Sequence, residues 1–429
     1  MKRILGPKLH QFGFRRGHTT VDLLMNMSQR WVDALHARRE VRAVALDISK
    51  AFDRVWHKGL LHKLATFGIS GPLLAWLKSF LSGRTQRVVV NGTGSSFLPI
   101  RAGVPQGSVL APLLFLVFIN DLFECVQNPL DVFADDSTLW TLIRDSSVAS
   151  RLAAANSLSA DLAEIEKWAK RWPVTFNSSK TESLIISTNR DMKNFRENPQ
   201  DKDGKLCFGP AACPHPHLVF CGRTLPESLS FKVVGLTFTC KLSWNMHIDN
   251  IAKAASRAIS FLHRARSVLS RPQLSTIYKS HVRSRMEYCS PIWTGASATS
   301  LVKLDRIQAR AAHMIGPSQA ILLSSLAHRR SVAALCAMHR IVHGTAPAPL
   351  LPLCPTRAPT RRRTRASAAH PTVFVPPHIV ATTATYWMRS FIPSMTVAWN
   401  ALPSAVQSDK DIRSFKTSVN NLSLDHSLL

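Results

Sequence analysis

The sequence has few acidic residues for its length. Among 429 residues, 26 are Asp or Glu and 54 are Lys or Arg, which leaves a formal net charge of +28. A chain with so few acids cannot neutralise its own basic side chains, so we expect it to meet a polyanion. Nucleic acid is the simplest such partner because its phosphates pair with these cations. A membrane surface is the alternative polyanion.

The sequence also lacks a long hydrophobic run. Its longest apolar stretch, residues 109–119, is shorter than the ~20 residues that a helix needs to cross a bilayer. The basic N-terminus contains no sustained apolar segment, which excludes a secretory signal. No basic amphipathic helix stands out as a membrane anchor. We therefore expect no membrane contact and an intracellular location, with the nucleus or the cytoplasm as the two options.

Closely spaced cysteine pairs are missing as well. The eight cysteines are scattered, which favours a reducing compartment over a disulfide scaffold. Five residues of types that bind zinc gather in one stretch, namely Cys207, Cys213, His215, His217 and Cys221. Because the stretch has no Cys-x₂-Cys spacing, a variable loop is the favoured interpretation and a zinc site the less favoured one.

The rest of the sequence is rich enough in apolar residues to form two or three domains, at 45% hydrophobic content. Periodicity predicts helices at 19–38, from about 49, and at 58–81, 109–124 and 146–171, and strands at 41–48, 86–90, 96–101, 184–187 and 232–238. Beyond about residue 245 helices dominate, at 247–269, 272–288, 298–315 and 329–343. A Pro-, Ala- and Arg-rich stretch follows and indicates a linker or an extended basic arm. No internal repeat is present.

One pair of carboxylates interrupts an apolar region. In Phe133-Ala134-Asp135-Asp136 the two acids stand between short apolar runs, which predicts two strands and a tight turn with both aspartates at its tip. Two neighbouring carboxylates repel each other unless a cation lies between them. Mg²⁺ is the expected ion, and phosphoryl transfer the expected chemistry. A solvated turn is the alternative, although the apolar flanks favour a site.

A metal site of this kind needs a third carboxylate. Asp47 is the candidate because it ends a buried strand, and a strand-end aspartate beside a hairpin turn can hold two Mg²⁺ ions between them. Asp53 is the rival on the same segment. For Asp53 we favour a surface charge paired with Arg54 or Lys50.

These residues resemble the palm motifs of reverse transcriptases. The three matching segments are Leu46-Asp47-Ile48-Ser49-Lys50-Ala51-Phe52-Asp53, then Gly103-Val104-Pro105-Gln106-Gly107-Ser108 with Leu113-Leu114-Phe115 and Ile119-Asn120-Asp121-Leu122, and then Phe133-Ala134-Asp135-Asp136. Further segments resemble the non-LTR, LINE-type, jockey-like group of retrotransposon polymerases, namely Gln11-Phe12-Gly13-Phe14-Arg15, Thr19-Thr20 and Trp399-Asn400-Ala401-Leu402-Pro403. The likeness runs from about residue 5 to the C-terminus.

The resemblance implies roles at matching positions. Asp47, Asp135 and Asp136 match the carboxylates that hold two Mg²⁺ ions, and Lys180 matches the lysine that assists pyrophosphate departure. A second set of residues matches substrate contacts: the steric gate Phe52, the nucleotide and template loop Gln106 and Gly107, and the primer-grip hairpin at Gly235. Taken without the family, Phe52 would be plain core, and Lys180 could equally be an exposed turn charge.

The resemblance also implies an architecture and an activity. We expect an α+β right-hand polymerase palm, an antiparallel sheet with packed helices, followed by an α-helical thumb and a basic C-terminal region. The expected domains are 1–190 (palm with incomplete fingers), 191–245 (variable loop and primer-grip-like hairpin), 246–345 (helical thumb-like domain), 346–384 (Pro/Arg-rich linker) and 385–429 (small C-terminal segment). The expected activity is RNA-directed DNA polymerisation from deoxynucleoside triphosphates on an RNA template, with a DNA primer or target.

Two rival functions stay open. The family's fingers strands and endonuclease domain are missing upstream, so we expect an N-terminally truncated element product. Such a chain could be a weak or inactive remnant that binds RNA or DNA without copying it. The second rival is an intron-encoded maturase polymerase, against which the Trp-Asn-Ala-Leu-Pro segment stands. The residues do not indicate an oligomeric state.

Overall fold

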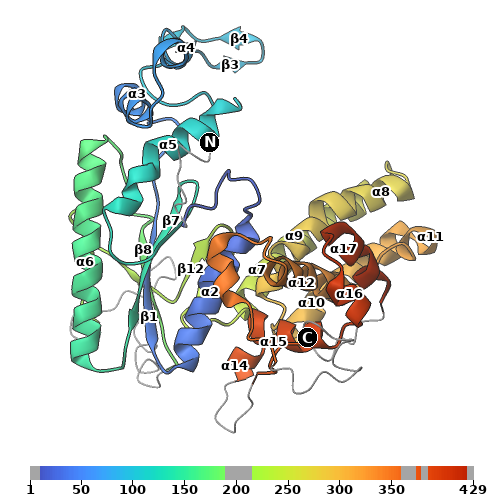
Figure 1. Cartoon of the computed structure of the whole chain (residues 1–429). Coiled ribbons are helices and arrows are strands. Elements are labelled where there is room, and N and C mark those ends of the chain that lie inside the picture. Colours follow the sequence, from blue (N-terminus) through green and yellow to red (C-terminus); the bar gives the residue numbers. More distant parts are fainter. Residues whose placement is uncertain (1–9, 189–214, 359–372, 378–384, 423–429) are drawn as a thin grey trace. The chain divides into compact units, whose positions relative to one another are not determined.

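The computed structural model describes residues 10–188, 215–358, 373–377 and 385–422. Contacts divide the chain into two compact units (Figure 1). Unit 1 consists of Met1–Arg16, Glu40–Ile185 and Asn189–Leu229, and unit 2 consists of Gly17–Arg39, Ile186–Thr188 and Ser230–Leu429. The five segments expected from the sequence stay a prediction. Among the described residues, no helix combines the length and the apolar character needed to cross a membrane.

Unit 1 mixes strands and helices. Its elements are β1 (Glu40–Leu46), α3 (His57–Thr66), α4 (Gly71–Leu81), β2 (Thr85–Gln86), β3 (Val89–Val90), β4 (Thr93–Gly94), β5 (Leu98–Pro99), α5 (Leu110–Ile119), the 3₁₀ helix η1 (Asn120–Glu124), β6 (Leu130–Phe133), β7 (Asp136–Ile143), α6 (Val148–Arg171), β8 (Glu182–Ile186), β9 (Val219–Phe220), β10 (Arg223–Thr224) and β11 (Glu227–Ser228). Five of these strands form one sheet in the order β11-β8-β1-β7-β6. The long helix α6 packs against β7 (Figure 1).

The core of unit 1 forms between this sheet and helix α5. The helix is apolar on every side, and Leu114, Phe115, Val117 and Phe118 are all buried. A helix without a polar face has to be enclosed by its neighbours. The buried helix therefore limits the movement of the central strands, including the ends of those strands.

Unit 2 is mainly helical. Its elements are α2 (Thr20–His36), β12 (Ser230–Val233), β13 (Leu236–Thr239), α7 (Asn245–Ala265), α8 (Arg271–Ile277), the π helix η3 (Tyr278–Arg283), α9 (Ser284–Glu287), η4 (Ser290–Ile292), α10 (Ala298–Ile315), α11 (Pro317–Ala320), α12 (Leu326–Val342), η5 (Ala348–Leu353), α14 (Thr385–Met388), α15 (Phe391–Asn400), α16 (Ser404–Ser408) and α17 (Ile412–Asn421). Aromatic rings fill its core. Trp31 contacts Phe238 with ring centroids 5.1 Å apart, and Trp399 stacks on Phe415 at 5.7 Å.

Most predicted elements are confirmed, with four corrections. The strand predicted at 86–90 is two short strands, because β2 pairs with β5 whereas β3 pairs with β4. No helix opens near Ser49, because Lys50 has a left-handed backbone (φ 51°) and residues 49–54 form turns. The predicted helix 58–81 is two helices, which end and restart around Gly68 (φ 82°). The predicted strand 232–238 is the hairpin β12–β13, because Val234 and Gly235 both have positive φ at its turn.

Candidate active site

Two neighbouring strands of unit 1 bring the predicted aspartates to one edge of the sheet. Strand β1 pairs with β7 in antiparallel register, with Leu46 opposite Ser137. Asp47 directly follows Leu46, and Asp136 directly precedes Ser137. Asp47 and Asp136 are thus the residues next to the last recorded pair, and the charge of Asp47 contributes to raising the pKa of Asp136. Residues far apart in the sequence thus meet at the end of a buried strand pair.

The turn between β6 and β7 differs in detail from the expectation. Phe133 pairs with Asp136, so the two turn residues are Ala134 and Asp135, and Asp136 already belongs to β7. Ala134 has φ 58°, and Asp135 does not share the positive φ, which is the pattern of a type II′ hairpin turn. An alanine is strained there. The strain implies that neighbouring residues hold this turn in place.

Gln11 is one such neighbour. Its side-chain Oε1 accepts hydrogen bonds from the backbone N–H of Ala134 (3.0 Å) and of Gly13 (2.7 Å). A Cβ atom on Gly13 would lie 2.4 Å from the backbone nitrogen of Ala134, so only glycine allows this close approach. We did not select Gln11 and Gly13 as site residues from the sequence. The signal for them was the Gln11-Phe12-Gly13 segment, which we used only to recognise the group.

Burial and neighbouring charge raise the pKa values of two of the aspartates, Asp135 and Asp136. Burial raises the pKa of Asp135, and the charge of Asp47 raises it further. The pKa of Asp136 is raised by the protein atoms around it and then by the charges of Asp135 and Asp47, although part of this side chain is open to solvent. Asp135 and Asp136 are therefore both sensitive to neighbouring negative charge, which a bound cation would offset.

The residue types at this end of the strands suit a divalent cation. Their side chains, however, are not arranged as a complete set of metal ligands. Carboxylate oxygens are the ligands that Mg²⁺ prefers, and the mutual repulsion of Asp47, Asp135 and Asp136 favours a positive charge among them. Within the ranges that the structure describes, however, no group of three or more His, Cys, Asp or Glu side chains is positioned to hold a metal ion. These side chains would have to turn towards a common point to do so.

Phe52 lies in the turn that follows Asp47. Its ring stacks on Phe115 at 4.6 Å and meets Phe14 edge-on at 6.2 Å, and its backbone carbonyl accepts a hydrogen bond from Val104 N–H at 2.8 Å. The ring is only half-buried. It therefore combines the core contact that its residue type suggests with a partly open surface, as a steric gate would need.

The predicted nucleotide loop is tied to the same turn. Gln106 Nε2 donates to Asp53 Oδ1 at 2.8 Å, so among the described residues Asp53 pairs with Gln106 and has no ion pair with Arg54 or Lys50. Gly107 has φ 84°, and nothing lies within 4 Å of where its Cβ would be. The loop thus has open space on the side of Gly107, where a ligand could approach the backbone closely.

Lys180 also lies near Asp47 along the backbone. Residues 177–180 form a turn in which Lys180 N–H donates to the carbonyl of Asn177, and Asn177 N–H donates to the carbonyl of Asp47 at 2.7 Å. The Lys180 side chain is exposed. The sequence analysis did not predict this contact between the Asn177 backbone and Asp47, because only the folded chain shows it.

Gly235, in contrast, belongs to unit 2. It has φ 82° in the turn between β12 and β13, and Tyr288 Oη donates to the carbonyl of Val234 in the same turn at 2.8 Å. Glycine is therefore required by the backbone conformation at this position. This requirement accounts for the residue type without deciding whether the hairpin contacts a primer.

A basic groove runs between two packed helices of unit 2. The groove, of about 840 Å³, is lined by Lys253 and Arg257 of α7 and by Lys303, Arg306 and Arg310 of α10. Asp249 is the one acid in its lining, and it pairs with Lys303. The remaining cations have the helical spacing that places them along one face. This face is suited to the backbone of a nucleic acid.

The predicted zinc ligands do not act together in the described residues. Cys207 and Cys213 lie outside those residues, and Cys221 is exposed. His215 is buried beside Glu40, with Nε2 3.5 Å from Oε2, yet its pKa is lowered to about 3 by burial and by the charges of Arg151 and Arg42. Burial, reinforced by the two arginine charges, keeps His215 a neutral ring beside these ion pairs.

Comparisons with known proteins identify the family of this chain. Residues 7–238 match the family described as reverse transcriptase (RNA-dependent DNA polymerase). The RNA-directed DNA polymerase from mobile element jockey of Drosophila melanogaster is 33% identical over 312 residues, which are 71% of this chain and 31% of that protein. The probable RNA-directed DNA polymerase from transposon X-element of the same fly is 28% identical over 328 residues, 75% of this chain and 33% of that protein.

A third relative, the jockey polymerase of Drosophila funebris, is 30% identical over 312 residues, 71% of this chain and 31% of the relative. The chain thus spans about a third of the length of these relatives. The matched region contains Asp47, Asp135 and Asp136 as well as the loop at Gly107. The chain therefore belongs to the reverse transcriptase family, and its relatives within that family are the polymerases of jockey-like, non-LTR mobile elements.

Proposed function

We propose that this chain is the polymerising part of a non-LTR retrotransposon protein. It would add deoxynucleotides to the 3′-hydroxyl of a DNA primer or target strand, with RNA as the template. The observation that carries the proposal is the register of β1 and β7, whose last pair, Leu46 and Ser137, has Asp47 and Asp136 as its next neighbours in the chain. Reverse transcriptases use divalent ions and take a template, a primer and nucleotides.

In this proposal Asp47 and Asp135 hold two Mg²⁺ ions, with Asp136 as the third carboxylate. When bound there, Mg²⁺ supplies positive charge at the primer hydroxyl and at the departing pyrophosphate. The carboxylates are suited to this task because their supports are rigid: β1 is paired along its whole length, and Gln11 holds the turn. Phosphoryl transfer depends on such positioning more than on covalent chemistry.

The other residues predicted from the sequence have proposed roles in binding the substrates. The Phe52 ring, stacked on Phe115, forms a stiff wall that would exclude a ribose 2′-hydroxyl. The open backbone at Gln106 and Gly107 would lie against the nucleotide and the template. Lys180 would place a positive charge near the pyrophosphate, and the Gly235 hairpin would hold the primer end.

The finer architecture belongs to the same proposal. The five-stranded sheet of unit 1 would be the palm, and the helices within 246–345 would be the thumb. The basic groove on α7 and α10 supports this assignment, since a thumb has to grip a phosphate backbone. Insertion at a chromosomal target would place the reaction in the nucleus.

A second candidate function is nucleic-acid binding without synthesis. It is favoured by one observation: the described carboxylates do not already form a set that could hold a metal ion. In this case the basic groove would retain RNA or DNA, and the aspartates would be inert.

Primer extension on an RNA template with Mg²⁺ tests both candidates. We expect Asp135→Asn to lower extension by about 1000-fold, because a ligand of the reacting centre contributes several kcal/mol. The affinity for the template–primer, measured by fluorescence anisotropy, should stay the same. Glu164→Gln is the matched control, because Glu164 is an exposed carboxylate of unit 1 that pairs only with Lys167 among the described residues.

Extension that survives in Asp135→Asn would remove the metal-site assignment. Binding without extension in the unaltered chain would favour the second candidate. A loss of binding together with extension would show instead that the substitution unfolds the protein, which circular dichroism of the same sample would reveal.

A further inference from the structure

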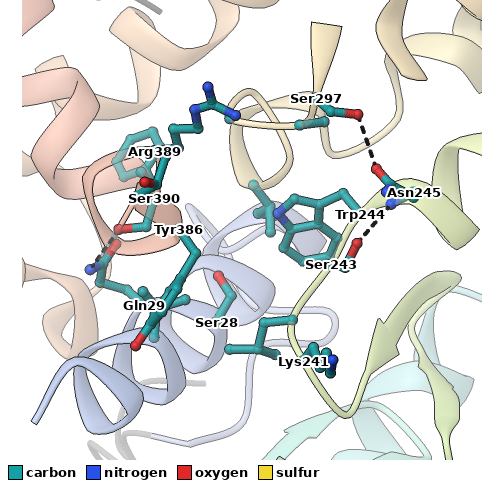
Figure 2. A pocket seen from close by; sticks show the side chains of 17 residues that line it. Ser28, Gln29, Lys241, Ser243, Trp244, Asn245, Ser297, Tyr386, Arg389 and Ser390 are labelled. Carbon is teal, nitrogen blue, oxygen red and sulfur yellow. Dashed lines mark hydrogen bonds between the residues drawn. The ribbon is translucent and has the colours of Figure 1, made fainter. Parts of the chain in front are cut away.

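Unit 2 contains a cavity that none of the roles above uses. Its volume is about 290 Å³, near the lower end of the range for small-ligand pockets, about 300–1,000 Å³. Four stretches of the chain form its walls: α2, the segment between β13 and α7, the segment between η4 and α10, and the start of the C-terminal helices α14 and α15 (Figure 2). The cavity is therefore a product of tertiary folding and not of one motif.

The lining carries positive charge without any acid. Lys241 and Arg389 are part of it, and it contains no Asp or Glu. Both side chains are exposed to solvent, and within the described part of the chain neither forms an ion pair. Asp33 lies on the neighbouring turn of α2 but is committed elsewhere, since it accepts from Gln29 Nε2 (2.9 Å) and Trp387 Nε1 (3.0 Å). An anion would complement these two cations.

Two aromatic rings stand on different sides of the same space. Figure 2 shows Trp244, from the segment before α7, on one side and Tyr386, from α14, on the other, with Arg389 at the upper rim. Trp244 is fixed from behind by Phe238, whose ring centroid is 5.5 Å away. Both rings are half-buried, so each keeps a surface on which a flat ligand could stack.

The polar groups of the cavity are held in place before any ligand arrives. Ser297 Oγ and Ser300 Oγ both donate to Asn245 Oδ1, at 3.1 and 3.0 Å. Gln29 Oε1 accepts from Ile392 N–H at 3.1 Å, which joins α2 to α15. Gly295 packs so closely on the Arg389 carbonyl that a Cβ would lie 1.9 Å from it. Preorganised walls of this kind reduce the entropy cost of binding.

We propose that this cavity binds one nucleotide, with its base against Trp244 and Tyr386 and its phosphate at Arg389 and Lys241. The combination is what selects this ligand class. An inorganic anion would pair with the cations but would not stack on the rings. An uncharged aromatic ligand would stack on the rings but would leave the cations unpaired. Proteins that hold single bases combine stacking rings with nearby cations in the same way.

The nucleotide has two possible sources: a free mononucleotide and an unpaired position of an RNA or DNA strand. Both present the same base and phosphate, so the chemistry of the pocket is common to them. None of the residues placed at the carboxylate site lines this cavity. Binding can therefore be tested without Mg²⁺, primer or polymerisation, and its outcome is independent of the proposed catalytic function.

Titration calorimetry of the full chain with adenosine 5′-monophosphate, and separately with a short single-stranded oligoadenylate, tests the proposal. We expect Arg389→Glu to weaken binding by about tenfold or more, because a phosphate contact becomes a repulsion. Tyr386→Leu should weaken it by about fivefold or more through lost stacking. Arg413→Glu on α17 is the matched control, since it reverses the same charge at an exposed position of unit 2 outside the cavity.

The two ligands separate the sources. Cavity-dependent binding of the mononucleotide with no further gain for the oligonucleotide indicates a free nucleotide, and tighter, cavity-dependent binding of the oligonucleotide indicates a strand. The proposal is overturned if neither ligand binds, or if Arg413→Glu weakens binding as much as Arg389→Glu does. It is also overturned if both cavity variants, folded by circular dichroism, bind like the unaltered chain.

Discussion

The two units differ in how deeply particular ion pairs are buried. Two ion pairs of unit 1 are buried: Arg42 and Glu227 form one with 0% and 4% of their side chains exposed, and Arg151 pairs with Glu40 at 6% and 3%. In unit 2 the pair between Lys303 and Asp249 is 46% and 41% exposed. Arg340 and Asp22 are intermediate, because only the aspartate is buried.

This difference assigns the charges to different tasks. Buried pairs cannot meet an external partner, so those of unit 1 organise the fold around the sheet that ends in Asp47 and Asp135. Unit 2 leaves most cations of its basic groove without an internal partner. The groove cations of unit 2 are therefore available to an external partner, whereas Arg42 and Arg151 of unit 1 are not.

The largest expected effect comes from removing the cation of a buried ion pair in unit 1. Arg42→Met should lower the free energy of unfolding by about 3–5 kcal/mol, because Glu227 is left buried without a counter-ion. Lys303→Met, in the exposed pair of unit 2, should cost at most about 1 kcal/mol. Urea unfolding of both variants measures the two values. If they are equal, burial does not distinguish the pairs; Arg42→Met combined with Glu227→Met should recover part of the loss.

The next effect concerns acid. His215 has a folded-state pKa of about 3 against 6.5 for the free side chain, so the unfolded chain takes up the proton first as the pH falls. The stability that this neutral ring contributes is complete above pH 6.5 and is lost progressively below it, by about 2 kcal/mol near pH 5. Comparing urea midpoints near neutral pH and near pH 5 measures the loss.

His215→Gln should be less stable near neutral pH but lose less on acidification. His217→Gln is the matched control, since His217 lies two residues away and is in none of the ion pairs described. An unchanged acid response in His215→Gln would mean that other groups of unit 1 set its sensitivity to pH.

A moderate effect is expected at the basic groove of unit 2. Arg306→Gln with Arg310→Gln should weaken the binding of a template–primer, and should reduce the slope of log affinity against log salt by about two, one for each lost phosphate contact. The control removes two exposed lysines of unit 1, Lys58→Gln with Lys170→Gln. If both double variants change the slope equally, the units do not differ in how they meet nucleic acid.

The smallest effect tests the repulsion at the sheet edge. The pKa of Asp136 is raised on folding, so its favourable contribution is present below its unfolded pKa and is lost as the pH rises through the folded value. Near neutral pH, Asp136→Asn should raise the melting temperature by about 1–3 °C and reduce the stabilisation that added Mg²⁺ produces.

Asp145→Asn, in the same unit, should change the melting temperature in the opposite direction. Hydrogen bonds from the Ser147 side chain and backbone lower the pKa of Asp145, so the charged form is favoured by folding and its removal should lower the melting temperature slightly. If Asp136→Asn and Asp145→Asn shift the melting temperature in the same direction, repulsion among the aspartates does not explain the effect of Asp136→Asn.

Local patterns were sufficient for many elements. The helix predicted at 19–38 is α2, where Thr19 and Asp22 form a capping box, and the predicted Asp135–Asp136 hairpin is present as β6 and β7. Both follow from spacing within a few residues. The helix predicted near Ser49 was wrong because Gly103 and Val104 donate hydrogen bonds to the carbonyls of Val55 and Phe52. Those partners lie about fifty residues away, where no local pattern can show them.

The candidate site shows the same difference between features that local sequence predicts and features that depend on distant contacts. Its carboxylates, the steric-gate position Phe52 and the loop at Gln106 could be proposed from motif residues, and their catalytic roles stay predictions. The supports could not: Gln11 under the Asp135 turn and Asn177 on the Asp47 carbonyl are held by hydrogen bonds across long stretches of sequence. Nothing in the residue types of Gln11 or Asn177 indicates which backbone they will meet.

By itself the amino-acid sequence determined the sign of the charge, the helical and hairpin segments, and membership of a polymerase family, because each depends on composition, short-range periodicity or the order of motifs. Only the tertiary structure decided which charges are buried as pairs and which stay free, and it alone assembled a cavity from four separate stretches. The physical reason is that strand register and helix packing depend on contacts between distant residues, and each such contact is selected by the whole core and not by its neighbours in the chain.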